Sequence, residues 1–350
     1  MSTGPALTFS FVIPVRDDAA RLRRCLASIR ANRYAGPVEI VVVDNGSRDA
    51  SADVARAAGA IVVVLPGLTV AELRNAGARH ATGEILAFVD ADHEIDAEWI
   101  AAVAEMLTNP DVTAAGAPCV PPRDGNWVQR AYDCLRSHRS GPHEVEWLGS
   151  GNLAIRSRIF SAIGGFDASL QTCEDVDLCN RLRQAGGRIV SDARARNVHF
   201  GDPATLRGLF TGELWRGRDN LRVFFRGPVT WRSIPSLAIP LIDLVCIAGA
   251  IAGAATLPWG GVLLLIASGA VIAFWSAVRA VKMTRELAHP RAIDVLANLV
   301  VAAVYDMARA LALVANAGHG VRRGTAPAAA AAASAISHSS AVEHGRHETR

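Results

Sequence analysis

The stretch Leu86-Ala-Phe-Val-Asp-Ala-Asp92 joins four apolar residues directly to a pair of carboxylates. A short apolar run of this kind is typical of a strand that is buried on both faces, as the strands of parallel sheets are. We therefore predict a buried strand over residues 84–89, which Asp90 follows directly. Similar runs precede it at residues 9–15, 38–43 and 60–65.

Between these runs the apolar residues recur at helical spacing. Leu22, Cys25, Leu26 and Ile29 predict an amphipathic helix over residues 18–32. Further helices are expected at 50–58 and 70–80. Strands that alternate with helices imply right-handed βαβ units and a parallel sheet. The predicted fold class is α/β, a doubly wound and mostly parallel sheet with helices on both faces.

Composition narrows the class of protein. The chain has 350 residues, which favours about two domains. Hydrophobic residues make up 51% and charged residues 20%, so a disordered chain is excluded. A net charge of only +3 argues against a nucleic-acid partner. The six cysteines form no CxxC pair, which indicates reduced thiols rather than a zinc site or a disulfide scaffold.

The character of the sequence changes after Gly201. Residues 203–233 are rich in arginine, and residues 234–257 and 259–278 are almost wholly apolar. Each apolar run is long enough to cross a hydrocarbon core of ~30 Å. The alternative is two buried core helices, but helices of this length in a protein core would carry more polar residues than Asp243 and a few serines. Basic residues flank the outer ends, at Arg226, Arg232, Arg279, Lys282 and Arg285.

Because positively charged flanks stay in the cytosol, we predict a hairpin in the cytoplasmic (inner) membrane. With two spans, the N-terminal domain and both termini face the cytosol. Residues 293–315 are apolar but carry polar residues on one stripe, so this segment is expected to be an amphipathic helix or a third membrane helix. The Ala-, Ser- and His-rich tail from Thr325 is predicted to be disordered.

Several carboxylates follow predicted strands, where ligands of such sheets bind. Asp90 and Asp92 can reach a hydrated divalent cation, which in proteins often uses one or two carboxylates and substrate phosphates. Asp44 follows the second strand; it either accepts hydrogen bonds from a base or ribose or closes an Asx turn. Glu174, Asp175 and Asp177 open a predicted helix as capping acids, or one of them is a general base.

Six ordered blocks of residues 8–201 resemble the inverting family 2 glycosyltransferases of the GT-A fold. The blocks are Phe11-Val-Ile-Pro-Val15, Val42-Val-Asp-Asn-Gly-Ser47, Leu73-Arg-Asn-Ala-Gly77, Phe88-Val-Asp-Ala-Asp92, Gly149-Ser-Gly-Asn152 and Gly164-Gly-Phe-Asp167 with Cys173-Glu-Asp-Val-Asp-Leu178. The resemblance implies a nucleotide-diphosphate sugar donor, a lipid-linked or glycan acceptor and a divalent metal, Mg²⁺ or Mn²⁺.

The same resemblance implies roles for individual residues. Donor contacts are expected from Pro14, Val15, Asp44, Arg74, Asn75 and Asp90. Metal ligands are expected at Asp92, Asp90 and His199. Asp175 is the expected catalytic base, with Glu174 beside it. The acceptor side is expected to include Trp147, Gly149, Asn152, Asp177 and Arg216.

The implied domains are a catalytic domain over residues 1–205 and a basic juxtamembrane linker over 206–233. A transmembrane hairpin over 234–280, a further helix over 291–317 and the tail over 325–350 complete the chain.

Some positions depart from the family pattern. His93 follows the acid pair, where other residues are usual, and receives no role. Arg16 stands where an acidic residue or Asn is common. The Q-x-x-R-W element of processive polysaccharide synthases is missing, since Glu213-Leu-Trp-Arg216 reverses its Trp and Arg. A processive synthase and a degenerate, non-catalytic membrane scaffold remain the alternative functions. A nucleotidyltransferase is disfavoured because residues 13–18 contain no glycine.

Overall fold

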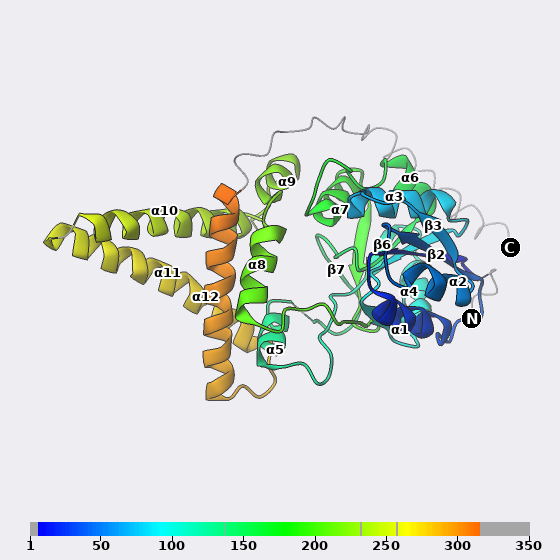
Figure 1. Cartoon of the computed structure of the whole chain (residues 1–350), viewed down its shortest axis with the longest axis horizontal. Helices are drawn as coiled ribbons and strands as arrows, with labels where there is room; N and C mark the ends of the chain where they lie inside the picture. The colour runs from blue at the N-terminus through cyan, green and yellow to red at the C-terminus, as the bar shows by residue number, and fades with distance from the viewer. Residues whose placement is uncertain (1–5, 137, 232, 257, 316–350) are drawn as a thin grey trace. The chain divides into compact units, whose positions relative to one another are not determined.

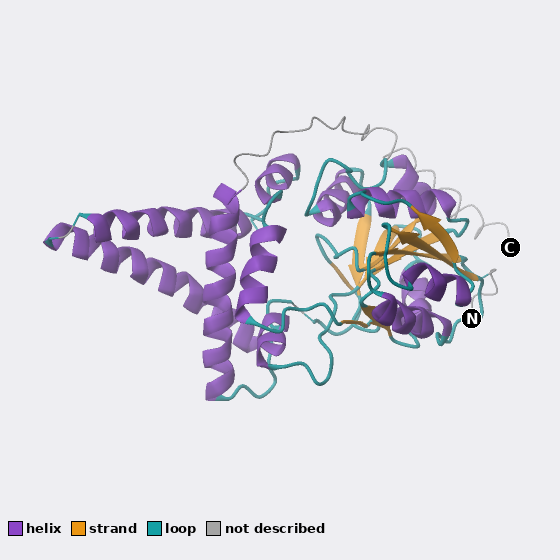
Figure 2. Cartoon of the chain, in the orientation of Figure 1, coloured by secondary structure: helices purple, strands orange, loops and turns teal. Residues whose placement is uncertain are grey.

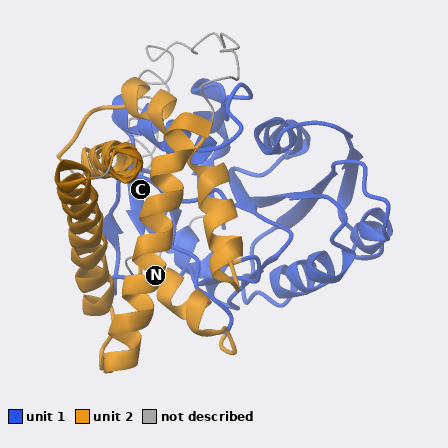
Figure 3. Ribbon diagram, turned by 60° about the vertical axis from the view of Figure 1, so that its left-hand side comes forward, with its two compact units in different colours: residues 1–122, 138–201, 322–350 blue, residues 123–137, 202–321 orange. Residues whose placement is uncertain are grey.

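The computed structural model describes residues 6–136, 138–231, 233–256 and 258–315 (Figure 1). The predictions for Arg232, Leu257 and residues 325–350 lie outside these residues. Two compact units are present (Figure 3): in the described chain, one comprises residues 6–122 and 138–201, and the other residues 123–136 and 202–315. All described strands belong to the first unit, while the second is helical (Figure 2).

This division differs from a domain boundary after residue 205. Helix α5 (Trp127–Asp133) precedes half of the first unit in sequence but contributes Val128 and Tyr132 to the core of the second. The chain therefore leaves the first unit after residue 122 and returns to it at residue 138.

The first unit is built on a mixed sheet of eight strands in the order β3-β2-β1-β4-β8-β6-β9-β7. Strands β3, β2, β1 and β4 pair in parallel, as do β6 and β9, while β8 is antiparallel to β4 and β6, and β7 is antiparallel to β9. The predicted α/β fold with a mostly parallel sheet is confirmed. The strands are β1 (Phe9–Val15), β2 (Val38–Asp44), β3 (Ile61–Val64), β4 (Ile85–Val89), β6 (Val112–Gly116), β7 (His143–Glu144), β8 (Asn152–Arg156) and β9 (Arg188–Ser191).

Apolar side chains cover both faces of this sheet, which explains why β1 and β4 are buried along their whole length. Phe11 packs with Trp99 on one face, and Phe88 packs with Phe160 and Phe166 on the other. Each such buried side chain contributes about 1.5–3 kcal/mol to folding. Helices α1 (Ala19–Arg30), α2 (Ser51–Ala57) and α4 (Trp99–Met106) line the first face, and α3 (Val70–His80), α6 (Ser157–Ala162) and α7 (Glu174–Gln184) line the second.

A second, two-stranded sheet lies directly after the acid pair. Strand β5 (His93–Ile95) follows Asp92 and pairs antiparallel with β10 (Asn197–His199). His93 is directly opposite His199 in this ladder. Side chains of directly opposed residues lie on the same face of an antiparallel pair. The small sheet therefore brings together two histidines that are more than a hundred positions apart.

The second unit contains three helices that are long and apolar enough to cross a membrane. α10 and α11 form a long hairpin, and α12 packs against both and against α8 (Figure 1). α11 continues beyond the predicted span end at Val278, so Arg279, Lys282 and Arg285 are part of the helix. The helices are α8 (Leu206–Arg216), α9 (Asn220–Arg226), α10 (Pro235–Ala255), α11 (Trp259–Arg285) and α12 (Ala292–Ala315).

Candidate active site

Several predicted donor residues share one edge of the main sheet. Pro14 and Val15 end β1, Asp44 ends β2, and Asp90 follows β4. Since β1 lies between β2 and β4 and the three strands are parallel, their carboxyl ends meet at this edge. Asp44 is buried, and one of its oxygens accepts a hydrogen bond from the Ser47 N–H at 2.7 Å. That bond reaches three residues along the chain, one more than in an Asx turn, and holds the loop after β2. A contact between Asp44 and a nucleoside stays a prediction.

Arg74 on α3 connects two of the predicted acids. Its guanidinium is 3% exposed and donates to Glu174 Oε1 at 2.7 Å and to Asp90 Oδ1 at 2.6 Å. Burial raises the pKa of Asp90, but the positive charges of Arg74 and His93 and the hydrogen bond from Arg74 together hold this pKa below its usual value. Charge-assisted bonds of this kind are short and strong. One arginine thus fixes Asp90 and Glu174 relative to each other.

Asp175, the predicted base, lies in the first turn of α7. Cys173, just before the helix, has a left-handed φ of 59°, a strained conformation for a residue other than glycine. The Asp175 carboxylate accepts hydrogen bonds from the N–H groups of Val176 at 2.8 Å and Ser150 at 3.3 Å. Burial, followed by the negative charge of Glu174, raises the pKa of Asp175 to about 7. A carboxylate poised near neutral pH is suited to accept a proton.

Asp92 lies beside two histidines. Its Oδ2 is 3.3 Å from His199 Nε2, and its Oδ1 is 3.7 Å from His93 Nε2. One ligand atom from each of the three residues lies within 4.8 Å of the others. A Cβ added to Gly201 would collide with both the Asp92 carboxylate and the His199 ring, so glycine lets these two side chains lie against the backbone. Oxygen and imidazole donors clustered in this way fit a divalent metal ion.

The charges around Asp92 favour its ionised form. Burial raises its pKa, but the hydrogen bond from His199 and the positive charges of His199, His93 and Arg21 lower it to about 2. Arg21 on α1 is 3.7 Å from Asp92 Oδ2 and 2.8 Å from Asp18. Asp92 is therefore an acceptor-only group over the whole physiological range. Asp90, in contrast, is not in the cluster of metal-type ligands among the described residues, and its oxygen is bonded to Arg74.

Three predicted contact residues are bonded to the protein itself. The Asn75 amide exchanges two hydrogen bonds with the Phe166 backbone, at 2.8 and 2.9 Å. Asn152 is fully buried and is bonded to the Trp99 indole N–H and to two backbone carbonyls. Asp177 is paired with an arginine one helical turn later at 2.8 Å. Each of these groups holds the scaffold, and contacts with donor or acceptor stay predictions.

The other predicted acceptor residues differ in their surroundings. Trp147 is 52% exposed. Gly149 borders the predicted base, since a Cβ there would be 3.8 Å from Asp175 Oδ2. Arg216 belongs to the second unit, where it donates to the buried Glu213 at 2.9 Å.

Sequence reasoning missed three residues of the site. Ser150 contacts both predicted acids of α7: its N–H donates to Asp175, and its hydroxyl is 3.4 Å from Glu174 Oε1. Arg21 lies on the polar face of α1, whereas the sequence pattern identified only the apolar face of this helix. His93 carried a usable signal, because it directly follows the acid pair in a position where histidine is unusual.

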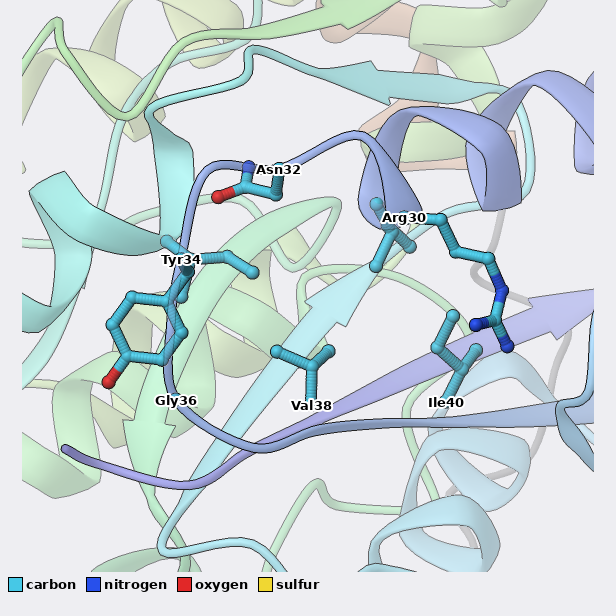
Figure 4. Close-up of a pocket in the computed structure, with 8 residues that line it drawn as sticks. Arg30, Asn32, Tyr34, Gly36, Val38 and Ile40 are labelled. Atoms are coloured by element: carbon cyan, nitrogen blue, oxygen red, sulfur yellow. The ribbon is translucent and has the colours of Figure 1, made fainter.

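A separate pocket lies at the other end of the sheet (Figure 4). Val38 and Ile40, at the amino-terminal part of β2, line it together with Arg30, Asn32 and Tyr34. Ligands of doubly wound sheets bind at the carboxyl ends of the strands. The lining contains no carboxylate or histidine, and we assign it no function.

The mostly parallel sheet and the acids at its carboxyl edge are those expected of a glycosyltransferase domain of the GT-A type. Residues 10–161 match the family described as glycosyl transferase family 2. This is the match that the six sequence blocks predicted, and it supports a family 2 glycosyltransferase.

Two relatives and one solved structure illustrate the similarity of this chain to known proteins. Pre-mycofactocin glycosyltransferase of Mycobacterium tuberculosis is 30% identical over 201 residues, which are 54% of this chain and 42% of that protein. This chain thus spans about two fifths of the length of that relative. Glycosyltransferase AglE of Haloferax volcanii is 25% identical over 242 residues, 66% of this chain and 78% of AglE.

The mannosyltransferase PcManGT from Pyrobaculum calidifontis, solved with GDP-Man and Mn²⁺, has a TM-score of 0.60 at 21% identity. The match covers 87% of this chain and 88% of that one. At this identity the likeness establishes the shared fold.

Proposed function

We propose that this chain is a metal-dependent inverting glycosyltransferase of the cytoplasmic membrane. It moves a sugar from a nucleotide-diphosphate sugar to a lipid-linked or envelope glycan acceptor at the cytosolic face. The observation that carries the proposal is the position of Asp175. Its carboxylate has a pKa near 7 and lies in the same helical turn as Glu174. Arg74 binds both Glu174 and Asp90, the first acid of the Asp90–Asp92 pair.

The donor is proposed to bind at the carboxyl edge of β1, β2 and β4. Pro14, Val15 and Asp44 line the nucleoside side, and Asp90 faces the ribose or sugar. Arg74 is held by two carboxylates, which supports a role in orienting Asp90 and Glu174. Preorganised groups of this kind reduce the cost of reaching the reactive geometry.

The metal is proposed to be Mg²⁺ or Mn²⁺, held by Asp92 and His199 together with diphosphate oxygens. PcManGT, which shares the fold, binds Mn²⁺ with GDP-Man. A bound divalent ion offsets the negative charge that builds on a leaving diphosphate. Two observations support this assignment: Asp92 is ionised far below neutral pH, and Asp92 and His199 lie together against Gly201.

The reaction is a single displacement. The acceptor hydroxyl oxygen forms a bond to the anomeric carbon while the bond from that carbon to the diphosphate oxygen breaks on the opposite face. The hydroxyl proton passes to the Asp175 carboxylate, and the bonding electrons leave with the nucleoside diphosphate. One displacement inverts the anomeric configuration. Gly149 borders the proposed base, and the exposed Trp147, two residues before it, is proposed to line the acceptor side.

The three apolar helices support a membrane-bound acceptor. An enzyme and an acceptor held at one surface meet at a high effective concentration. The basic residues around the hairpin support the cytosolic orientation of the first unit.

A donor panel tests the proposal with the full chain in detergent or in lipid nanodiscs. We expect one radiolabelled nucleotide-sugar to be consumed in the presence of Mn²⁺ or Mg²⁺ and spared in EDTA. NMR of the product is expected to show the anomeric configuration opposite to that of the donor. Retention of configuration, or transfer that is indifferent to EDTA, would contradict the proposed mechanism.

A further inference from the structure

His93 is buried beside the proposed metal, and neither the family pattern nor the proposed mechanism uses it. It is 3% exposed, and its ring centroid is 4.4 Å from that of His199. A buried histidine with no function usually satisfies both ring nitrogens with protein partners. The two nitrogens of His93 are in different environments, and this difference carries the inference.

The Nδ1 side of the ring is bonded to the backbone. Nδ1 is 2.7 Å from the carbonyl oxygen of Gly151, and the Cys119 thiol lies on the same side at 3.8 Å. A carbonyl oxygen only accepts hydrogen bonds, so Nδ1 carries the proton. In a neutral imidazole the other nitrogen, Nε2, is then an unprotonated lone-pair donor. This is the usual arrangement of metal-binding histidines, in which one ring nitrogen donates to a carbonyl and the other binds the metal.

The surroundings of Gly151 hold the carbonyl in place. The same oxygen accepts a second hydrogen bond, from Asn197 Nδ2 at 2.8 Å. A Cβ on Gly151 would collide with the His93 ring, so this glycine allows the ring to lie against the backbone. Asn197 is in β10, two residues before His199. The orientation of His93 is therefore fixed by the strand that also presents His199.

The Nε2 side of the ring faces the cluster. The Asp92 carboxylate is 3.7 Å from His93 Nε2 and 3.3 Å from His199 Nε2. Ligands bound to one ion at about 2.1 Å lie about 3 to 4 Å apart. Both measured separations fall in this range. The register of β5 and β10, which pairs His93 with His199, places both imidazoles on one face of the small sheet.

We propose that His93 is a third protein ligand of the metal, through Nε2, and that the resulting set of two imidazoles and one carboxylate makes the site prefer Mn²⁺ to Mg²⁺. Imidazole suits transition metals, whereas Mg²⁺ prefers oxygen ligands and keeps its waters. Three protein ligands also allow the ion to bind before the donor arrives. The inference deepens the proposed donor site and rests on it.

The test measures metal binding rather than transfer. Electron paramagnetic resonance titrates Mn²⁺ into the full chain in detergent without donor, with Mg²⁺ as a competitor. His93→Asn is the informative variant, because the shorter amide can still donate to the Gly151 carbonyl but has no atom at the Nε2 position. We expect Mn²⁺ affinity to fall at least about tenfold, and the preference for Mn²⁺ over Mg²⁺ to fall with it.

His80→Asn is the matched control. The His80 Nδ1 is also bonded to a backbone carbonyl, that of Ala76 at 2.9 Å, but its ring is not part of the metal-type cluster. This variant is expected to bind Mn²⁺ as the wild type does. A folded His93→Asn variant with wild-type Mn²⁺ affinity would overturn the proposal.

The wild-type protein provides a second test that needs no variant. Electron spin echo modulation of bound Mn²⁺ detects coordinated imidazole nitrogen, and we expect two histidines on the ion. One histidine, or none, would overturn the proposal even if His93→Asn failed to fold. Two histidines on Mn²⁺ in a protein that transfers no sugar would support the ligand set and count against the proposed function.

Discussion

Two regions of the molecule each place one arginine near two carboxylates, and they differ in how the acids are bonded. In the first unit Arg74 binds both Asp90 and Glu174. In the second, Arg279 on α11 binds Asp306 on α12 at 2.7 Å. Asp243 on α10 interacts electrostatically with this pair, but neither of its buried oxygens has a hydrogen-bond partner.

The comparison separates two uses of a buried arginine. Arg74 donates a hydrogen bond to each of its two acids, and the negative charge of Glu174 acts on the next residue, Asp175, whose pKa it raises. Around Arg279 the surplus acid lies among apolar helices, where a carboxylate is costly. We infer that the first cluster sets the pKa of the proposed base and that the second joins α11 to α12.

The largest expected effect is on transfer. Asp175→Asn removes the proposed base while it keeps the size of the side chain and an oxygen for the N–H groups of Ser150 and Val176. We expect the rate of transfer to fall by about 10²–10⁴-fold, the usual contribution of a positioned base. Initial rates with the donor found in the panel, at pH 8 and saturating metal, measure the loss.

The control is Asp53→Asn, which changes an exposed carboxylate of α2 that is paired with Arg56 at 2.8 Å. This variant should keep the wild-type rate. Near-normal turnover by folded Asp175→Asn would remove Asp175 from the mechanism.

The next largest effect distinguishes the two arginines. Arg74→Lys cannot form the fork that reaches two acids at once. We expect transfer to fall about 10²-fold, because small displacements of positioning groups have effects of this size. Arg279→Lys weakens the pair with Asp306, so its thermal midpoint should fall while the rate of transfer changes less than about twofold. Rates and thermal unfolding are measured for both variants in the same detergent; equal losses of transfer in the two would contradict the division of roles.

The parallel half of the sheet could be predicted because its signal is local. Residues 9–15, 38–43 and 84–89 are short apolar runs separated by helices, and β1, β2 and β4 begin and end within one residue of them. Strands β5 to β10 were not predicted. β8 pairs antiparallel with both of its neighbours, so its pairing requires no crossover helix. The alternation of strand and helix that predicts a parallel βαβ unit is therefore missing around it.

The sequence predicts which residues could form the site, but it does not predict which of them are hydrogen-bonded to one another. Arg74 and Glu174 are 100 positions apart, and His93 meets the Gly151 carbonyl 58 positions away. Such pairs depend on strand register and helix packing, which local patterns do not encode. Asn75 and Asn152 illustrate the same limit, because their predicted contacts were with ligands and their hydrogen bonds are with the protein.

A smaller effect concerns stability and pH. The pKa of Asp175 is raised in the folded protein to about 7, so the folded state holds this proton more tightly than the unfolded state does. Its contribution to stability is complete below the unfolded pKa of ~3.9 and is lost as pH rises through about 7. Asp175→Asn has no carboxyl group to titrate and keeps its stability over this range. Relative to that of the wild type, its free energy of unfolding should therefore rise by about 1 kcal/mol between pH 6 and pH 8.

Denaturant unfolding of both proteins at several pH values measures the difference, in which titrations common to both cancel. A difference that stays constant from pH 6 to pH 8 would show that Asp175 titrates elsewhere. The same group should appear in catalysis as a rise of kcat/KM with pH through about 7.

The smallest expected effect tests the surplus acid of the second cluster. Asp243→Leu removes a buried carboxylate whose oxygens have no hydrogen-bond partner and leaves the bonded Arg279–Asp306 pair electrically balanced. We expect a small rise in the thermal midpoint and an unchanged rate of transfer. Asp306→Leu is the matched comparison: it deletes the acid that Arg279 binds, and it should lower the midpoint. If Asp243→Leu destabilises the chain as much as Asp306→Leu does, the two acids share the arginine equally, and the contrast with Arg74, which is bonded to both of its acids, no longer holds.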